Sequence, residues 1–237
     1  MRSRAPRLGI LASMGGAVMG RLIESPWFRS QLALVAVDRP CGALERASAA
    51  GLPVALCTSD DAAAREVLLA DAFERHGVEH VFVFYTRMLR HDVLRRYAGR
   101  LWNLHPSLLP AFPGAHGFED SFAARVPVLG ATLHAIDDGM DTGPVLMQSA
   151  FARTDAMTIA QARHEIFTQQ VRMTLQAARW LVAGRVSVTD ARSVLRESPP
   201  ATVHERTLFS PGLDDHEAMS HPVSHPVASS RTSQFPR

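Results

Sequence analysis

Polar residues that could do chemistry stand directly after two apolar segments of the chain. Asn103 and His105 end one such segment, and an acidic glycine loop, residues 137–143, follows another. An imidazole can hold a proton near neutral pH, and a nearby carboxylate can keep it protonated or relay protons. An amide N–H can donate a hydrogen bond to a developing oxyanion. Together these residue types suit acyl transfer.

Short apolar segments alternate with helical patterns through the first hundred residues. Uniformly apolar strands that alternate with helices predict an α/β fold with an open, doubly wound, mostly parallel sheet. Ligands of such sheets bind beyond the carboxyl ends of the strands, where both polar groups fall. The predicted strands are 8–12, 32–37, 54–57 and 81–85. One predicted helix covers 42–50, and another begins after Asp60 or Asp61, either of which can cap it, and runs to His76.

The pattern changes after Gly99. A predicted strand, 101–104, ends in a segment with two prolines, and the predicted strands 128–136 and 145–151 flank the acidic loop. Residues 158–182 have the apolar spacing of a long helix that ends at Gly184. From residue 197 the composition shifts to Pro, Ser and His. We therefore predict a catalytic domain over 1–196 and a poorly packed extension over 197–237.

Composition excludes several classes of protein. The chain has 237 residues with 25 Lys+Arg against 23 Asp+Glu, a balance that argues against a nucleic-acid binder. It contains no apolar run long enough to span a membrane, and its two cysteines provide neither a disulfide framework nor a cysteine zinc site. The basic start followed by apolar residues has the outline of a signal peptide, but glycines 15, 16 and 20 interrupt it. We expect a buried first strand and a cytoplasmic protein.

Four sequence blocks, in order, resemble the folate-dependent formyltransferase family. They are LWNLHPSLLP at 101–110, FPG at 112–114, GATLH at 130–134 and MDTGPVLMQ at 140–148. The resemblance runs from about residue 8 to residue 188 and includes a weaker match at 43–53. It implies a Rossmann-like formyltransferase fold and transfer of a formyl group from 10-formyltetrahydrofolate to a small-molecule amine, with no metal, by a monomer or homodimer.

The resemblance also implies roles for individual residues. Asn103 would donate to the oxyanion of the tetrahedral intermediate, His105 would act as imidazolium or proton shuttle, and Asp141 would keep His105 charged and relay a proton through water. The folate pocket would involve Arg87, Met88, Leu89, Leu94, Ile136, Asp137, Asp138 and Gly139.

The departures from the family pattern lie on the acceptor side. Purine-pathway members carry Gly-Ser-Asn in the first turn, where this chain has Gly16, Ala17 and Val18, and they carry Glu where it has Gln170. We therefore expect an acceptor other than glycinamide ribonucleotide, such as an amino acid, a hydroxyornithine-type amine or an amino sugar. The residues expected to bind it are Gly15, Gly16, Ala17, Val18, His134 and Gln170.

Other interpretations stay open. The chain could be the purine-pathway enzyme with a divergent first turn, or a non-catalytic folate-binding relative, against which the intact Asn103, His105 and Asp141 argue. A formyl-folate hydrolase would need a preceding regulatory domain, for which the sequence leaves no room. Single residues also have simpler roles: Arg87 could pair with an acid, and His134 could be a buried strand histidine. The two glycines of the first turn could serve a positive φ, and the three aspartates of the acidic loop could be turn residues.

Overall fold

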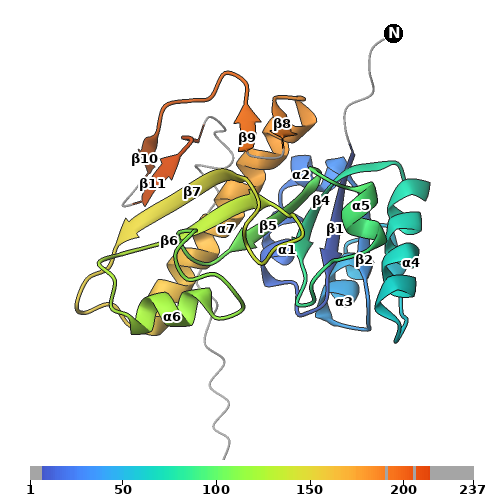
Figure 1. Cartoon of the computed structure of the whole chain (residues 1–237), viewed down its shortest axis with the longest axis horizontal. Helices are drawn as coiled ribbons and strands as arrows, with labels where there is room; N and C mark the ends of the chain where they lie inside the picture. The colour runs from blue at the N-terminus through green and yellow to red at the C-terminus, as the bar shows by residue number, and fades with distance from the viewer. Residues whose placement is uncertain (1–6, 190–191, 205–206, 214–237) are drawn as a thin grey trace, which may run out of the picture.

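A mixed sheet organises the protein (Figure 1). The computed structural model describes residues 7–189, 192–204 and 207–213, and within these residues the strand order is β10-β11-β7-β6-β5-β4-β1-β2-β3. One half of the sheet is parallel. Its strands are β1 (Arg7–Ala12), β2 (Leu32–Val37), β3 (Val54–Leu56), β4 (Val78–Phe84) and β5 (Leu101–His105). The predicted open, mostly parallel α/β sheet is confirmed.

The strands of the parallel half form because their residues are apolar on both faces. Every residue of β2 is buried, as expected of a central strand that helices cover on both sides. The connecting helices begin and end at the predicted signals: the Asp61 carboxylate caps α4 by accepting a hydrogen bond from the Ala64 amide, and Gly77 follows the helix with φ 64°. These helices are α1 (Ala17–Leu22), α2 (Pro26–Gln31), α3 (Gly42–Ala49), α4 (Ala62–Arg75) and α5 (Asp92–Arg96).

The sheet changes direction after β5. β5 pairs antiparallel with β6 (Val128–Ala135), and β6 pairs antiparallel with β7 (Val145–Ala152). The short helix α6 (Gly117–Ala123) lies in the connection between β5 and β6. The parallel half therefore ends at the strand that carries Asn103 and His105, and the acidic loop between β6 and β7 comes from the antiparallel half.

The predicted long helix is α7 (Ile159–Val182). Thr158 and Gln161 form a capping box at its start, because each side chain satisfies the main-chain amide of the other. The helix contacts β6, β7 and β1 on one face of the sheet and also touches α1, whereas α4 contacts β2 and β4 (Figure 1). Trp180 is fully buried among the residues that α7 packs against the sheet.

The segment after residue 197 differs from the expected poorly packed extension. β11 (Thr207–Ser210) pairs antiparallel with β7, and β10 (Thr202–His204) pairs with β11. Phe209 is fully buried, and its neighbours Leu208 and Ser210 are exposed, so the strand has the alternation of a half-buried sheet edge. The expectation is therefore wrong for these strands, because three or four alternating residues are too short a signal within a Pro/Ser-rich composition. The domain boundary at 196/197 stays a prediction. Residues 214–237, which include a Ser-His-Pro-Val sequence at 220–223 and its repeat at 224–227, lie outside the described residues.

Two further expectations concern the start of the chain and its cysteines. β1 is a buried strand, as predicted. Within the described residues no helix is both long and apolar enough to cross a membrane. Cys41 and Cys57 are both free thiols.

A separate hairpin, β8 (Val186–Thr189) with β9 (Arg192–Leu195), follows α7.

Candidate active site

Asn103 and His134 face each other across neighbouring strands. They are directly paired residues of β5 and β6, so their side chains stand on the same face of the sheet. The Asn103 amide nitrogen lies 3.1 Å from Nε2 of His134, and Nδ1 of His134 lies 2.9 Å from the carbonyl oxygen of Ala135. An amide nitrogen is always a donor, so Nε2 accepts and Nδ1 carries the hydrogen.

That arrangement requires a neutral His134. Burial lowers the pKa of His134 below its ordinary value of 6.5, and the repulsion from His105 acts in the same direction. His134 is a buried strand histidine, as one interpretation of the sequence had it. It also orients the Asn103 amide, whose second hydrogen meets no acceptor within the described part of the chain. The amide can therefore present a hydrogen-bond donor to a ligand.

His105 lies between two oxygen acceptors. Its Nδ1 is 3.2 Å from Oδ2 of Asp141, and its Nε2 is 2.7 Å from the carbonyl oxygen of Phe112. A carbonyl oxygen only accepts, so Nε2 carries a hydrogen, and Nδ1 is the atom that faces the carboxylate. Gly117 permits this position, because a Cβ there would lie 2.4 Å from Nε2.

Asp141 brings its carboxylate to the two histidines from the loop between β6 and β7. Its backbone has φ 57°, a left-handed conformation that aspartate tolerates better than most residues. Oδ2 accepts a hydrogen bond from the Gly114 amide at 2.7 Å, and Oδ1 lies 3.6 Å from Nε2 of His134. The Asp141 carboxylate therefore accepts a hydrogen bond from another loop, so Asp141 does more than stabilise its own turn.

The segment after His105 is fixed by side chains from β6 and β7. The Thr132 hydroxyl donates to the Ser107 carbonyl and accepts from the Leu109 amide, and Gln148 donates to the Leu109 carbonyl at 2.8 Å. The Ser107 hydroxyl in turn donates to the Ala111 carbonyl at 2.7 Å and also lies 3.2 Å from the Phe112 carbonyl. These side chains thus hold the segment that carries the Phe112 oxygen, which meets Nε2 of His105.

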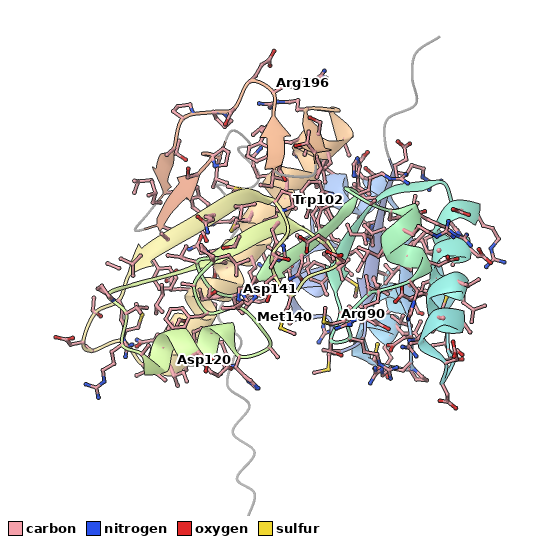
Figure 2. The ribbon with its side chains drawn as sticks, viewed as in Figure 1. Arg90, Trp102, Asp120, Met140, Asp141 and Arg196 are labelled. Carbon is pink, nitrogen blue, oxygen red and sulfur yellow. The ribbon has the colours of Figure 1, made fainter. Side chains whose placement is uncertain are left out.

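A cavity of about 360 Å³ opens beside this cluster. Figure 2 shows Met140 and Asp141 at the centre of the molecule, between α6 and the segment that carries Arg90. Gly114 and Ala115 also line the cavity and were not among the predicted site residues, although the FPG block at 112–114 pointed to this loop. The predicted site residues that line the cavity are Arg87, Met88, Leu89, Asn103, His105, His134, Ile136, Asp137, Gly139 and Asp141; Leu94 and Asp138 do not line it.

The wall on the β4 side is held by buried acceptors. The Ser13 hydroxyl accepts a hydrogen bond from the Thr86 amide at 3.1 Å. Asp38, whose side chain is fully buried at the end of β2, accepts from the Tyr85 hydroxyl at 3.1 Å and meets Nε of Arg87 at 3.2 Å. Burial raises the pKa of Asp38, but hydrogen bonds from Arg39 and Tyr85 and the nearby Arg87 outweigh it, so the pKa lies below its ordinary value. Arg87 both pairs with an acid and lines the cavity.

The predicted acceptor residues of the first turn lie outside the cavity wall. Gly16 precedes α1 with φ 65°, and a Cβ there would lie 2.9 Å from Cβ of Ala43, so this glycine meets a conformational need. The Gly15 carbonyl accepts a hydrogen bond from Nε of Arg46 at 3.0 Å. Gln170 lies on α7, which packs against α1, so the two predicted acceptor segments belong to neighbouring helices. Among the described residues no group of His, Cys, Asp and Glu could hold a metal ion.

A family model for formyl transferases matches residues 11–178, a span that contains the whole cluster around the cavity. The chain belongs to the formyl transferase family. The resemblance stated from the sequence is therefore confirmed, and the protein is a formyltransferase.

Several relatives of this formyltransferase carry more specific names. A phosphoribosylglycinamide formyltransferase from Mycobacterium tuberculosis is 34% identical over 192 residues, covering 78% of this chain and 89% of that protein. One from Bacillus subtilis is 37% identical over 153 residues, covering 61% and 78%. The crystal structure of glycinamide ribonucleotide transformylase 1 from Symbiobacterium toebii superposes with a TM-score of 0.76 at 28% identity, covering 83% of this chain and 96% of that one.

These relatives overturn one expectation from the sequence. An acceptor other than glycinamide ribonucleotide was predicted because Ala17, Val18 and Gln170 depart from the purine-pathway pattern. That prediction is wrong, since homologues over most of the chain are named phosphoribosylglycinamide formyltransferases. Main-chain amides bind anions whatever side chains accompany them, so the changed side chains at positions 17 and 18 do not define a different acceptor.

Proposed function

We propose that this formyltransferase transfers the formyl group of 10-formyltetrahydrofolate to the amino group of glycinamide ribonucleotide. The observation that carries the proposal is the 34% identity to a phosphoribosylglycinamide formyltransferase across 89% of that protein's length. The cavity supports it, because about 360 Å³ is within the size range of small-molecule sites and lies against the Asn103, His105 and Asp141 cluster. The cytoplasmic location and the monomeric or homodimeric state stay predictions.

In the proposed reaction the acceptor amine attacks the formyl carbon, and the formyl oxygen becomes an oxyanion. The free hydrogen of the Asn103 amide is the donor for that oxyanion, and His134 keeps the amide turned toward it. Collapse of the intermediate breaks the bond between the formyl carbon and N10 of the folate. The amine loses one proton and N10 gains one.

His105 and Asp141 would move those protons. As an imidazolium, His105 supplies positive charge beside the oxyanion, and Asp141 stabilises that charge from 3.2 Å. The Asp141 carboxylate also takes the proton from the amine through water and returns one to N10. Asn103, His105 and Asp141 keep the roles that the sequence suggested for them.

The folate would occupy the cavity between the β4 and β6 loops. Arg87, Met88 and Leu89 form one wall, and Ile136, Asp137 and Gly139 form the other. Main-chain groups of both loops are available to hydrogen-bond the pterin ring, and the apolar side chains cover its faces. Leu94 and Asp138 support the walls from outside the cavity in this proposal.

The acceptor would lie on the α1 side of the cluster. The Ser13 hydroxyl contacts Thr86 in the cavity wall, so the first turn, residues 14–18, begins beside the folate site. In the proposal the phosphate binds the main-chain amides of Gly15, Gly16, Ala17 and Val18, and Gln170 contacts the ribonucleotide from α7. Ala17 is exposed, so the turn is accessible to a ligand.

The test is an assay of purified protein with 10-formyltetrahydrofolate, following release of tetrahydrofolate by absorbance. Glycinamide ribonucleotide should support turnover at about 1–1,000 per second, the ordinary range of enzymes. Mass spectrometry should show one formyl group on the ribonucleotide. Folate release without acceptor, or no release with glycinamide ribonucleotide, would contradict the proposal.

A further inference from the structure

The loop after β4 makes one wall of the cavity without regular secondary structure of its own. Residues 85–89 line the cavity, and residues 90 and 91 lead into α5. A wall of this kind keeps its shape only if its main chain is bonded to neighbouring elements. Its first half is tied to Ser13 and Asp38, as described above.

The second half of the loop is tied to a single carboxylate, that of Glu66. The main-chain amide of Arg90 donates to Oε1 of Glu66 at 2.9 Å, and that of His91 donates to Oε2 at 2.8 Å. Each oxygen of the carboxylate therefore accepts one N–H. Figure 2 shows Arg90 on the side of the molecule that carries α4 and α5.

The Glu66 carboxylate is buried and contacts the loop rather than solvent. It lies in the second turn of α4, a helix packed against β2 and β4, and only 3% of it is exposed. Hydrogen bonds that a charged group accepts in a buried position are stronger than neutral ones. Removing the carboxylate would leave two main-chain amides without their acceptor at the point where the wall ends.

We infer that Glu66 is a positioning residue for the folate donor: its carboxylate fixes the main chain that carries Arg87, Met88 and Leu89. It acts through the loop and touches no reacting atom. The inference rests on the proposed function for the identity of the donor but not for that of the acceptor. Donor affinity is therefore the property that depends on Glu66.

The test compares Glu66→Ala and Glu66→Gln with Leu69→Ala. Leu69 is fully buried on the same helix, in the core cluster that also holds Leu89, and its side chain makes no hydrogen bond. Its truncation therefore lowers stability without removing an acceptor from the amides of residues 90 and 91. Binding of 10-formyltetrahydrofolate is titrated without acceptor, which keeps the result independent of whether glycinamide ribonucleotide is the acceptor. Melting temperature is measured on each variant.

Glu66→Ala should raise the donor Kd about tenfold, the effect of losing hydrogen bonds to a charged group. Glu66→Gln keeps one accepting oxygen but turns an NH₂ group toward the other amide, so it should fall between wild type and Glu66→Ala. In steady-state assays the KM for the donor should rise, whereas the KM for the acceptor and kcat at saturating donor should stay within about twofold of wild type. This pattern is expected when a substitution weakens the binding of substrate and transition state equally. Leu69→Ala should lower the melting temperature and leave the donor Kd within about twofold, as a purely structural change does.

Hydrogen exchange gives a readout that needs neither substrate. The amides of residues 90 and 91 should exchange faster in Glu66→Ala, and the amides of β4 should not. In Leu69→Ala the amides of residues 90 and 91 should not gain exchange rate more than other amides do. If Glu66→Ala speeds their exchange and the donor Kd stays at the wild-type value, the inference is overturned. An equal loss of donor affinity in Leu69→Ala at matched stability would overturn it as well.

If Glu66→Ala does not fold, Glu66→Gln carries the test by the same two criteria. If wild-type protein binds 10-formyltetrahydrofolate but leaves glycinamide ribonucleotide untouched, the proposed acceptor fails and the inference stands or falls on the Kd values. If wild type does not bind the donor, both fail.

Discussion

Gly114 and Asp141 are joined by a hydrogen bond from the glycine amide to Oδ2, the same carboxylate oxygen that meets Nδ1 of His105. The loop after β5 therefore contributes to the placement of a carboxylate that belongs to the loop after β6. His105, which lies between the two loops, is held on both sides: by Asp141 at Nδ1 and by the Phe112 carbonyl at Nε2.

Replacing His105 with Ala should lower kcat about 100-fold, the usual contribution of general acid–base catalysis. The fold should persist, although the half-buried Phe112 carbonyl loses one of its donors. Steady-state assays with glycinamide ribonucleotide measure the loss. His76→Ala, at the far end of α4, is the matched control and should keep wild-type kinetics. Full activity of His105→Ala would contradict the proposed role.

Asp141→Asn removes the charge and keeps an oxygen for the Gly114 amide. Asparagine also tolerates a positive φ, so the loop should keep its conformation. We expect kcat to fall about 100-fold because His105 loses its counter-charge and the proton relay loses its base. Asp120→Asn, on the exposed side of α6 (Figure 2), removes the same charge and should have no effect. Equal kinetics for the two variants would exclude a proton-transfer role for Asp141.

Asn103→Ala should cost about 100- to 1,000-fold in kcat, the range for removing one oxyanion donor. Because His134 only orients the amide, His134→Ala should cost less. It leaves Asn103 in place but free to rotate. The two substitutions together should cost no more than Asn103→Ala alone, since they act on one hydrogen-bonded unit. Additive losses in the double variant would show that His134 acts on the substrate directly.

His80 makes stability depend on pH. Burial, with a smaller effect of Arg100, lowers its pKa from 6.5 to about 4, and its Nδ1 accepts a hydrogen bond from the Trp102 indole at 3.4 Å. Between pH 6.5 and 4 the unfolded state binds a proton at His80 that the native state does not bind. The part of the free energy of unfolding that depends on a neutral His80 is therefore fully present above pH 6.5 and is lost as the pH falls toward 4. At pH 5 the loss amounts to about 2 kcal/mol.

Urea unfolding at pH 8 and pH 5 measures that loss. His80→Gln keeps an acceptor for the Trp102 indole and does not titrate, so its stability should fall less between the two pH values, by about 2 kcal/mol. His134, whose pKa burial also lowers, contributes in the same direction in both proteins. Parallel pH profiles for wild type and His80→Gln would contradict the prediction.

The sequence predicted the features that depend on local pattern. Uniformly apolar runs predicted the parallel strands, because burial on both faces excludes polar residues, and the family blocks predicted the strand ends that carry Asn103 and His105. Asp38 and Glu66 were missed because their partners in the cavity loop lie more than twenty residues away along the chain and only packing brings them together. Asp38 did leave a signal, since it follows an apolar strand at its carboxyl end.

The acceptor was predicted wrongly for a related reason. Side chains at positions 17, 18 and 170 are visible in a sequence, whereas main-chain amides are present at every non-proline position and leave no trace in it. The short strands β10 and β11 were missed because three or four residues give too little alternation to detect.

The register of β5 against β6 restricts how this enzyme can be recombined. Asn103 and His134 meet because they are directly opposed in an antiparallel pair, and a slip of one residue would turn His134 to the other face of the sheet. Chimeras with a related enzyme should therefore exchange both strands together or neither. Residues 124–127 join α6 to β6 outside that pair, so we expect a designed insertion there to leave the pair in place.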